Sequence, residues 1–478
     1  MNSRLPFPFR VLARPLDARQ RARIAEAVRA LLRFQRTLRA WPAPGWGADA
    51  TPFVSLYAGG TLRGCFGSDE GKTGGERLTR AFLRALEDPR HGGVSARERR
   101  GLVAQVSYVR APFAVDAERV LDLLEPGTHG VALARAGAAP VLFLPDVARD
   151  GRLGATEMLE GLARKAGLPA DGWRACALAL FETTSIVVRG EAREDRAGAP
   201  EDRAAAWLAR RVGADGAVAF GIEPRSRAPA AMGPMPHGRA AVALAGLAAH
   251  GGHAQALGRG RARLRRDLEA ALAGRAVPGW PEDPALIAGT LALAVLGGIE
   301  VTAELQAFAR EQRAAIARVP WNAAQVCAAL GPRAADSMYR ACVADLERQP
   351  WAPWTVMAAR ARGDAAVLAR GERGLCAQIR RRGPHEGGVG VTPVPELALT
   401  AVTVEALAPS SSAQARAGVA RARAFLMRWQ LLGEGIPAAL DVAMADGAFP
   451  ISPVCESLRC DVTGHALLAL TLADQSCR

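Results

Sequence analysis

Lysine is nearly absent from this chain of 478 residues, in which it occurs only at Lys72 and Lys165. The 61 basic residues are therefore almost all arginine, and their excess over 47 acidic residues gives a formal net charge of +14. Clustered cations favour nucleic-acid binding, because phosphate then releases its counterions. Here most arginines are interspersed with Asp and Glu, and the dense basic blocks are residues 259–266 and 380–382. The bias indicates a GC-rich coding sequence, and we expect no nucleic-acid partner.

A long hydrophobic run is also missing. The longest, residues 284–301, is interrupted by three glycines and by Glu300, and it is shorter than the ~20 apolar residues that span a bilayer. The first 12 residues contain Pro6 and Pro8 but no apolar core with a small-residue cleavage site, so no secretory signal is visible. We therefore expect a cytoplasmic, bacterial protein without a membrane span.

The cysteines show neither a CxxC pair nor a regular spacing. This pattern excludes a disulfide scaffold and predicts free thiols in a reducing compartment. With 50% hydrophobic and 23% charged residues, the composition is that of a globular protein. The eight cysteines are Cys65, Cys176, Cys327, Cys342, Cys376, Cys455, Cys460 and Cys477.

The two halves of the chain differ in their hydrophobic periodicity. Between residues 53 and 190, segments of period 2 alternate with helical windows, which predicts an α+β fold. After about residue 229, helical windows follow one another, separated by Gly- and Pro-containing turns. We predict an α+β domain at 1–190, a linker with a short helix at 191–228, and an all-α domain at 229–478.

The helical half contains an internal repeat with a register shift of 60 residues. Residues 387–407 align without gaps to residues 447–467, with identities that include Gly387, Val402 and Leu407. Each unit is a Gly/Pro-rich turn followed by a helix of small residues, and one such unit cannot bury its apolar face alone. The pattern resembles the (α/α) toroids of terpene cyclases and protein prenyltransferase β-subunits. The resemblance implies an (α/α) toroid with a central cavity, although the acidic cluster of class II cyclases is missing.

Residues 62–67 (LRGCFG) carry the strongest local signal in the chain. They resemble the LRGCIG hexapeptide of the AMMECR (AMME chromosomal region) domain family. The order of further motifs agrees with that family at residues 86–90, 103–107, 127–130, 143–147 and 162–168. The resemblance implies an antiparallel sheet with flanking helices and a cleft lined by the hexapeptide, but it supplies no reaction. One departure is Asp146, which stands where the family has an amide.

The chemistry of the hexapeptide allows two interpretations. Gly64 and Gly67 free the backbone for close approach or positive φ, as in a loop whose N–H groups bind an anion. Arg63 can fork onto a carboxylate or phosphate, and its cation would lower the pKa of Cys65 and make this thiol a nucleophile or a soft-metal ligand. With Leu62 and Phe66, these residues would form a ligand-binding cleft. The alternative is a tight turn with a buried thiol and a structural salt bridge.

Two further residues of this half are candidate functional residues. His129 lies in a Gly-flanked turn before a predicted strand, as a general base or a hydrogen-bonding anchor would require; a plain turn histidine is the alternative. Lys165, one of the two lysines, is a candidate ligand for an anion, although a cation in the last turn of a helix is also favourable for its dipole.

In the helical half, the repeat places His465 opposite Glu405. Asp461 shares a helix face with His465, because the two are four residues apart. We expect these three residues to bind a ligand. Cys460, Asp461 and His465 also suggest zinc, but the spacing differs from that of prenyltransferases, so we assign no metal. Tryptophans that either line an aromatic cavity or pack in the core are Trp280, Trp321, Trp351, Trp354 and Trp429.

Two functional hypotheses follow. The first is an enzyme or enzyme component, with Cys65 and His129 as catalytic residues beside an anion and with a hydrophobic or peptide substrate in the toroid. The second is a non-catalytic accessory protein that binds a small molecule, a peptide or a partner. Redox or radical pathway enzymes are candidate partners, and no cofactor is assigned.

Overall fold

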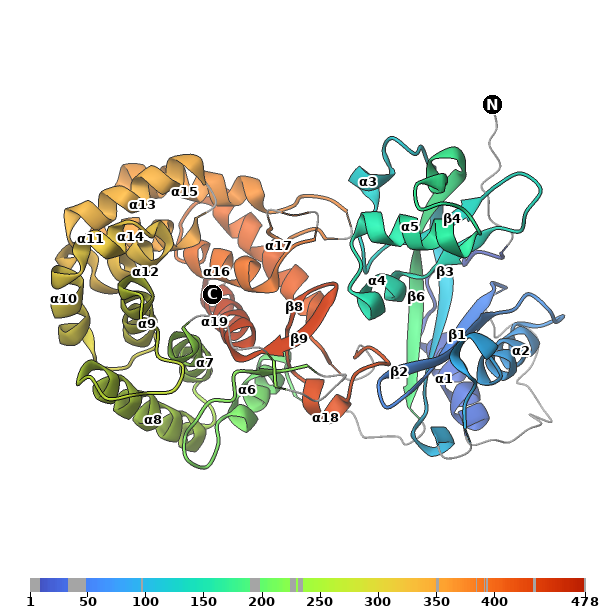
Figure 1. Cartoon of the computed structure of the whole chain (residues 1–478), viewed down its shortest axis with the longest axis horizontal. Helices are drawn as coiled ribbons and strands as arrows, with labels where there is room; N and C mark the ends of the chain where they lie inside the picture. The colour runs from blue at the N-terminus through green and yellow to red at the C-terminus, as the bar shows by residue number, and fades with distance from the viewer. Residues whose placement is uncertain are drawn as a thin grey trace.

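The computed structural model describes an α+β part and a helical part that lie side by side (Figure 1). The predicted linker falls partly outside the described residues, since residues 191–197 and 224–228 are not among them. Trp351 and Cys477 also fall outside. The division into domains at 190 and 228 therefore stays a prediction. The described residues are 9–32, 49–95, 98–189, 198–223, 229–230, 235–349, 352–383, 385–390, 392, 394–432 and 436–476.

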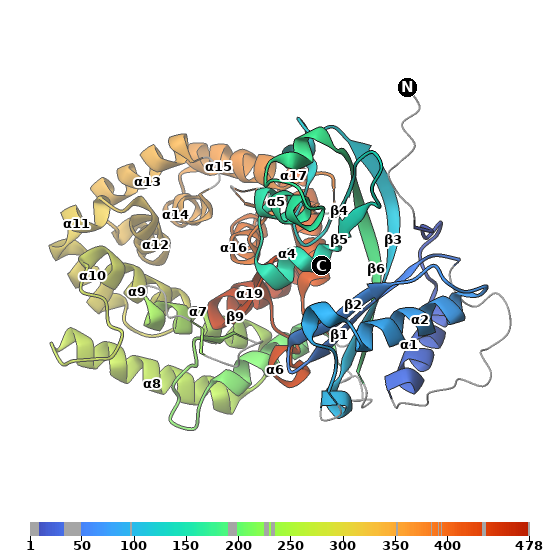
Figure 2. The ribbon, with the colours of Figure 1, turned by 45° about the vertical axis from the view of Figure 1, so that its right-hand side comes forward.

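The α+β part is built on an antiparallel sheet. In the described residues this sheet has six strands in the order β2-β1-β3-β6-β4-β5. The long strands β3 and β6 run through its centre and curl (Figure 2), and their register shifts between Arg110 and Phe113. This confirms the α+β class. The strands are β1 (Pro52–Ala58), β2 (Thr61–Gly67), β3 (Val103–Val115), β4 (Gly130–Ala134), β5 (Val141–Phe143) and β6 (Ala177–Arg189).

Helices pack against the sheet through separate apolar clusters. One cluster joins β1 and β3 to α1 (Ala18–Leu32) and α2 (Gly74–Leu86). Helix α2 buries Leu78, Ala81, Phe82 and Ala85 on one stripe, as a period of 3.6 residues requires. A second cluster lies around α5. The remaining helices and short 3₁₀ turns of this part are α3 (Val120–Leu123), α4 (Pro145–Gly151), α5 (Ala155–Lys165), η1 (Pro89–His91), η2 (Glu98–Gly101) and η3 (Gly172–Ala175).

The helical part has an inner and an outer set of helices (Figure 1). The inner helices contact one another in cyclic order, and α19 returns to α7. Several of them begin with proline, whose fixed φ and missing N–H suit the first helical turn; this explains the Gly/Pro-rich turns of the sequence. In cyclic order they are α7 (Pro236–His250), α9 (Pro284–Leu296), α12 (Pro320–Leu330), α14 (Pro353–Arg362), α16 (Leu397–Leu407) and α19 (Cys460–Ser476).

The outer helices pack against the inner ones. Helix α6 (Pro200–Arg211) lies within the segment predicted as a linker, contacts α7 and α19, and buries Trp207 completely. A small antiparallel sheet, β7 (Gly221–Ile222), β9 (Cys455–Arg459) and β8 (Pro450–Ser452), lies beside them. The others are α8 (Ala254–Leu272), α10 (Thr302–Glu311), α11 (Arg313–Ala317), α13 (Asp336–Arg348), α15 (Ala365–Gln378), α17 (Ala413–Trp429), with short α18 (Val442–Ala445) and η4 (Gly331–Arg333).

The sequence repeat corresponds to a structural one. Gly387 and Gly447, which the alignment superimposes, have φ values of 89° and 91°. A Cβ at Gly387 would lie 2.1 Å from Arg421 O of the outer helix α17, and a Cβ at Gly447 would lie 2.1 Å from Arg203 O of the outer helix α6. Only glycine combines this backbone conformation with this close approach, so both copies use the same turn.

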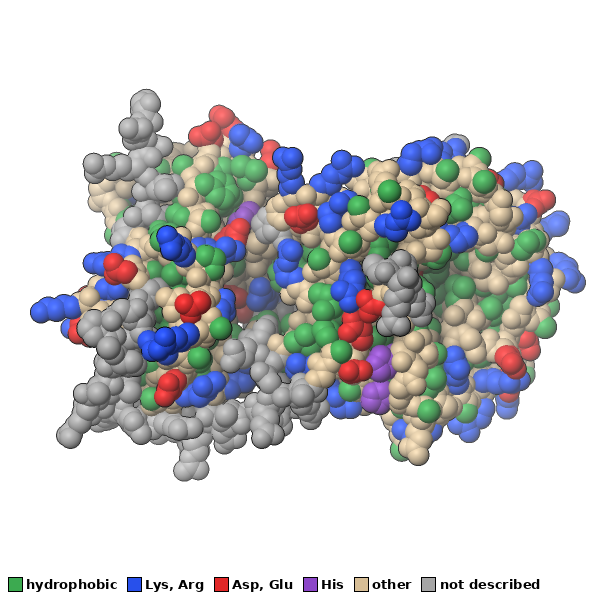
Figure 3. Space-filling model, turned by 180° about the vertical axis from the view of Figure 1, so that it is seen from behind, with side chains coloured by type: hydrophobic (Ala, Val, Ile, Leu, Met, Phe, Trp, Pro, Cys, Tyr) green, Lys and Arg blue, Asp and Glu red, His purple; other side chains and the backbone are tan. Residues whose placement is uncertain are grey.

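Basic and acidic side chains mix on the surface. The face in Figure 3 shows arginines dispersed over both parts, with acidic groups among them. No helix in the described part of the chain is long and apolar enough to cross a membrane.

The two parts meet through a small apolar contact. Leu62 and Tyr57 of the sheet pack with Ala438 and Ala439 of the helical part. Arg189, at the end of β6, donates to the carbonyl oxygens of Ile436 and Pro437 over 3.0 and 3.2 Å. The sheet face that carries Leu62 is therefore turned toward the helical part.

Candidate functional site

A polar row crosses the sheet face that is turned toward the helical part. Cys65 on β2 lies opposite Ser55 on β1, and Ser55 lies opposite Gln105 on β3. Ser55 Oγ donates to Cys65 Sγ over 3.3 Å. Two residues after Gln105 on β3, Ser107 lies opposite Ser185 on β6. The hydroxyl oxygens of the two serines are 2.9 Å apart. Period-2 alternation places these side chains on one face.

Asp146 at the start of α4 extends this row. Gln105 Nε2 donates to Asp146 Oδ2 over 2.5 Å, and Arg149 Nη1 donates to Asp146 Oδ1 over 3.1 Å. Burial raises the pKa of Asp146; Arg149 opposes that rise, and Asp150 adds to it. A carboxyl group with a raised pKa keeps its proton to a higher pH than an exposed aspartate does.

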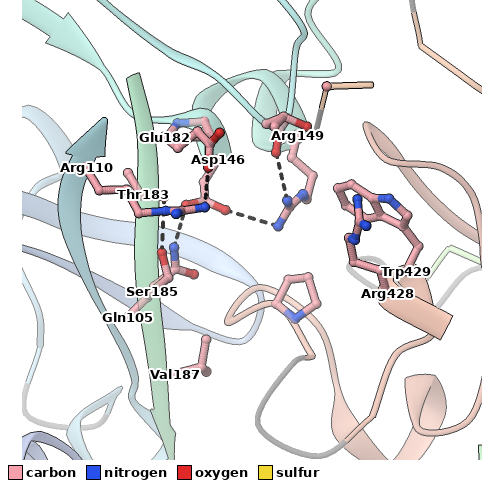
Figure 4. A pocket seen from close by; sticks show the side chains of 15 residues that line it. Gln105, Arg110, Asp146, Arg149, Glu182, Thr183, Ser185, Val187, Arg428 and Trp429 are labelled. Carbon is pink, nitrogen blue, oxygen red and sulfur yellow. Dashed lines mark hydrogen bonds and ion pairs between the residues drawn. The ribbon is translucent and has the colours of Figure 1, made fainter. Parts of the chain in front are cut away.

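A pocket of about 560 Å³ opens above the row, between the two parts of the chain. We call it the shared pocket. The sheet and α4 contribute Gln105, Asp146 and Arg149, whereas the helical part contributes Arg428 and Trp429 (Figure 4). The guanidinium of Arg149 lies between Asp146 and Trp429, with its Cζ 6.0 Å from the indole centroid. The remaining described lining includes the ion pair Arg110–Glu182 and residues Gly127, Thr128, Thr183, Ser185, Val187, Gly383, Pro145 and Pro437.

A buried ionisable pair lies behind one wall of the pocket. Glu125 Oε2 of the α+β part lies 3.3 Å from Nε2 of His385, which is fully buried in the helical part. Burial raises the pKa of Glu125 to about 7 and lowers that of His385 to about 3. The His385 ring centroid lies 6.0 Å from that of Trp429, so this pair supports the pocket wall.

The hexapeptide forms the edge strand β2 and not a loop, which corrects one expectation. Gly64 has no positive φ; a Cβ there would lie 1.8 Å from Ala85 O of α2, so close packing and not turn geometry requires this glycine. Gly67 packs against the Phe53 ring in the same way, at 2.4 Å. Phe66 faces the apolar cluster of α2, with Arg84 5.1 Å from its ring centroid.

Arg63 points away from the pocket because of a β-bulge. Leu56 pairs with Gly64 and Tyr57 pairs with Leu62, so that Arg63 is the extra residue between them. Its Nε lies 2.9 Å from Glu98 Oε1. The carboxylate that pairs with Arg63 therefore belongs to Glu98 of this chain and not to a ligand. The bulge places Leu62 and Cys65 on the same face, opposite Tyr57 and Ser55.

Cys65 has a different electrostatic environment from the one predicted. Its backbone N–H donates to Asp88 Oδ2 over 3.0 Å, where an anionic ligand was expected. Burial raises the pKa of Cys65, against the lowering effects of Ser55, Lys165 and Arg90. Arg63 is not among the largest contributors to this shift in pKa. The nearby cations are therefore Lys165 and Arg90, and a catalytic role of the thiol stays a prediction.

His129 and Lys165 make local contacts. The backbone N–H of Glu125 donates to His129 Nδ1 over 3.2 Å, and burial lowers the pKa of this histidine. Lys165 Nζ donates to Leu142 O over 2.9 Å, on the edge strand β5, and burial lowers its pKa. Lys165 lowers the pKa of Cys65, and Cys65 in turn raises the pKa of Lys165. His129 and Lys165 are absent from the described lining of the shared pocket.

The candidates of the helical part are paired with other side chains of the same part. His465 Nδ1 lies 2.8 Å from Glu405 Oε1, and Asp461 pairs with Arg459 and Arg239. Their roles as ligand-binding residues stay predictions. In the part of the chain that the structure describes, no group of three or more His, Cys, Asp and Glu side chains could hold a metal ion.

The tryptophans do not gather in one place. The ring of Trp354 lies near those of Trp321 and His465, with centroids 6.5 and 6.0 Å apart. Trp280 lies beside His237, whereas Trp429 lines the shared pocket.

The sequence pointed to only part of the shared pocket. Asp146 was named as a departure from the family motif and Trp429 as a candidate for an aromatic cavity, and both line the pocket. Gln105 lies inside the motif at 103–107 but was not singled out. Arg428 and Trp429 belong to no motif, and their position beside Asp146 depends on how the two parts pack.

The comparisons with known proteins define the class. Residues 12–186 match the sequence pattern of the AMMECR1 family. A protein of Methanosarcina acetivorans is 31% identical over 134 residues, which cover 27% of this chain and 67% of that protein. The chain therefore belongs to the AMMECR1 family, and the resemblance inferred from the hexapeptide is confirmed.

Two further matches each cover a minority of this chain. A protein of Methanococcoides burtonii is 33% identical over 125 residues, which span 25% of this chain and 62% of that protein, less than two thirds of its length. A solved structure, an uncharacterized protein from Pyrococcus horikoshii, covers 36% of this chain and 93% of that chain, with 23% identity and a TM-score of 0.32. The relatives are archaeal, and the bacterial source stays a prediction.

Proposed function

We propose that the chain is an enzyme or enzyme component that binds a small anionic molecule in the shared pocket. One observation carries the proposal: Asp146, hydrogen-bonded to Gln105 and Arg149, stands in a polar pocket that also contains Arg110 and Arg428. Guanidinium groups bind carboxylates and phosphates, and a carboxyl group with a raised pKa can transfer a proton to a bound molecule. The role of Asp146 would be acid–base catalysis.

The proposed anion site lies away from the hexapeptide, where the sequence had placed it. Arg63 is engaged by Glu98, and Asp88 accepts the Cys65 N–H. The hexapeptide would instead support the site, because Cys65, Ser55 and Gln105 lie in one row that ends at Asp146.

A non-catalytic accessory role is the second candidate. The raised pKa of Cys65 favours it, because a protonated thiol is a poor nucleophile. In that case the pocket would hold a ligand or partner without chemistry.

We further propose that the helical part is an (α/α) toroid similar to those of terpene cyclases and prenyltransferases. The cyclic contacts of the inner helices and the equivalent turns at Gly387 and Gly447 support it. Glu405, Asp461 and His465 would bind a hydrophobic or peptide substrate there. A cytoplasmic location and redox or radical pathway partners stay predictions.

Native mass spectrometry of the full chain tests the pocket proposal. After incubation with a mixture of anionic, neutral and cationic metabolites, we expect at least one anion to be retained. Ser185→Trp, which fills the pocket, should abolish retention, whereas Ser411→Trp in an exposed loop should not. Failure to retain any small molecule would refute the proposal. Asp146→Asn should retain the anion and, if the chain is an enzyme, lose turnover of it.

A further inference from the structure

Gln105 places a buried amide group on the sheet wall of the shared pocket. Its side chain lines the pocket and is only 4% exposed. Its Nε2 donates to Asp146 Oδ2 and, over 3.3 Å, to Ser107 Oγ. These two acceptors fix the orientation of the amide, and its Oε1 has no hydrogen-bond partner among the described residues. A buried acceptor in this state costs free energy unless a ligand or water completes it.

Two hydroxyl groups of β6 continue the same wall (Figure 4). Thr183 and Ser185 are half-buried and line the pocket, because residues two apart on a strand share a face. Ser185 Oγ lies 2.9 Å from Ser107 Oγ and 3.4 Å from Thr183 Oγ1. Since Ser107 also accepts from Gln105, a chain of polar groups runs along the wall and ends at Thr183. A hydroxyl group can donate one hydrogen bond and accept two, so the end of this chain keeps capacity for a ligand.

Two ion pairs flank the wall and decide between possible donors on a ligand. Arg110 pairs with Glu182, and Arg149 pairs with Asp146. An ammonium group beside either carboxylate would also meet a guanidinium group, which repels it, and it could not accept from the serine and threonine hydroxyls. A ligand hydroxyl can donate to Gln105 Oε1 and accept from the protein at the same time. The wall therefore favours hydroxyl groups over an ammonium group.

The length of the wall requires more than one hydroxyl group. Gln105 lies opposite Val187, which is four residues from Thr183 on β6, a distance of about 13 Å along the strand. A single hydroxyl group cannot contact both ends, whereas hydroxyls on successive carbon atoms can share the wall. The pocket volume of about 560 Å³ is sufficient for such a chain or ring together with an anionic group.

We propose that the shared pocket binds a ligand whose anionic group is carried on a chain or ring with several neighbouring hydroxyl groups, which Gln105, Ser185 and Thr183 recognise. The inference rests on the proposed function, because it names the ligand class of the same pocket. It gives the polar row of the sheet a role in specificity besides its support of Asp146.

Matched probes test the ligand class on the full chain. Erythritol 4-phosphate carries three hydroxyls, butyl phosphate has the same chain without them, and 4-aminobutyl phosphate has an ammonium group instead. Gluconate and hexanoate repeat the comparison with a carboxylate. NMR titration of the probe signals gives the affinities. We expect erythritol 4-phosphate to bind at least about tenfold more tightly than butyl phosphate, as two or three net hydrogen bonds allow, and more tightly than 4-aminobutyl phosphate.

Variants connect this preference to the wall. Thr183→Val removes one half-buried hydroxyl and should weaken erythritol 4-phosphate binding about threefold, with butyl phosphate unchanged. Gln105→Leu should weaken it about tenfold. Thr184→Val is the matched control, because Thr184 is the next residue of β6, lies outside the described lining and faces the other way. A general loss of structure would weaken both phosphates together, so Thr183→Val gives an answer even if Gln105→Leu is unstable.

The outcomes separate this inference from the proposed function. Equal binding of erythritol 4-phosphate and butyl phosphate, or tighter binding of 4-aminobutyl phosphate, would overturn the inference. So would an equal effect of Thr183→Val on erythritol 4-phosphate and butyl phosphate. If the metabolite mixture yields a retained anion but neither erythritol 4-phosphate nor gluconate binds, the ligand class is wrong and the pocket proposal stands. If neither experiment shows binding, the proposed function itself fails.

Discussion

Glu405 and His465, which occupy the same position in two copies of the sequence repeat, face each other across α16 and α19 with Oε1 and Nδ1 2.8 Å apart. Both side chains are about nine-tenths buried, at 10 and 11% exposure. Burial by itself lowers the pKa of His465, but the Glu405 carboxylate, together with Asp461, raises it above the usual value. A buried carboxyl–imidazole pair therefore joins the two copies inside the helical part.

The stability of this pair should depend on pH. A histidine whose folded-state pKa is raised stabilises the fold fully below about pH 6.5, and this contribution is lost as the pH rises through the raised value. Glu405→Gln should therefore cost about 3 kcal/mol at pH 6 and less at pH 9. Urea unfolding across this range measures the difference. The exposed Glu282→Gln is the control, and a cost independent of pH would contradict the assignment.

Glu125→Gln should stabilise the protein at alkaline pH. Burial raises the pKa of Glu125 to about 7, so the folded state favours the protonated carboxyl group. The stability that comes from this protonation is lost as the pH rises from about 4.5 through about 7. Glutamine imitates the protonated form. We expect a gain of about 1 kcal/mol at pH 8, reduced by partial solvent screening, and none at pH 4.5, measured by unfolding. The pKa of His385 in the folded protein is about 3, below the pH range compared, so this histidine titrates there only in the unfolded state, which is common to both proteins. Equal stability of the two proteins at every pH would contradict the burial of this carboxylate.

Gly387→Ala and Gly447→Ala should each destabilise the helical part by about 2–4 kcal/mol, because an alanine there is strained and meets a carbonyl oxygen 2.1 Å from its Cβ. Gly363→Ala has a similar φ of 73° but nothing within 4 Å, so it should cost about 1 kcal/mol. Chemical unfolding gives all three values. If the three variants lose the same stability, close approach is not the reason for these glycines.

Alkylation of Cys65 by iodoacetamide at neutral pH should be slower in the folded protein than in the unfolded one, because burial raises the thiol pKa. Arg90→Gln should slow it further, by about threefold, whereas Arg63→Gln should have no effect. Mass spectrometry of labelled peptides follows the reaction. Slower labelling in Arg63→Gln alone would restore Arg63 as the cation that activates this thiol.

The sequence by itself determined the family of the first part and the repeat of the second. The hexapeptide and its downstream motifs identified the AMMECR1 domain, since local patterns of glycines and alternating residues define strands and their neighbours. The repeat at Gly387 and Gly447 was visible because a turn that only glycine can adopt leaves a fixed residue in the chain.

Only the tertiary structure decided where the shared pocket lies. One extra residue in a strand reverses which side chains face inward. The bulge at Arg63 therefore turns the predicted cation away from Cys65. No periodicity in the sequence marks this bulge. Asp146 lines the same pocket as Arg428 and Trp429 because the α+β part and the helical part pack against each other. Such contacts depend on the shapes of both surfaces and not on the local order of residues, so the pocket could not be derived before the parts were placed.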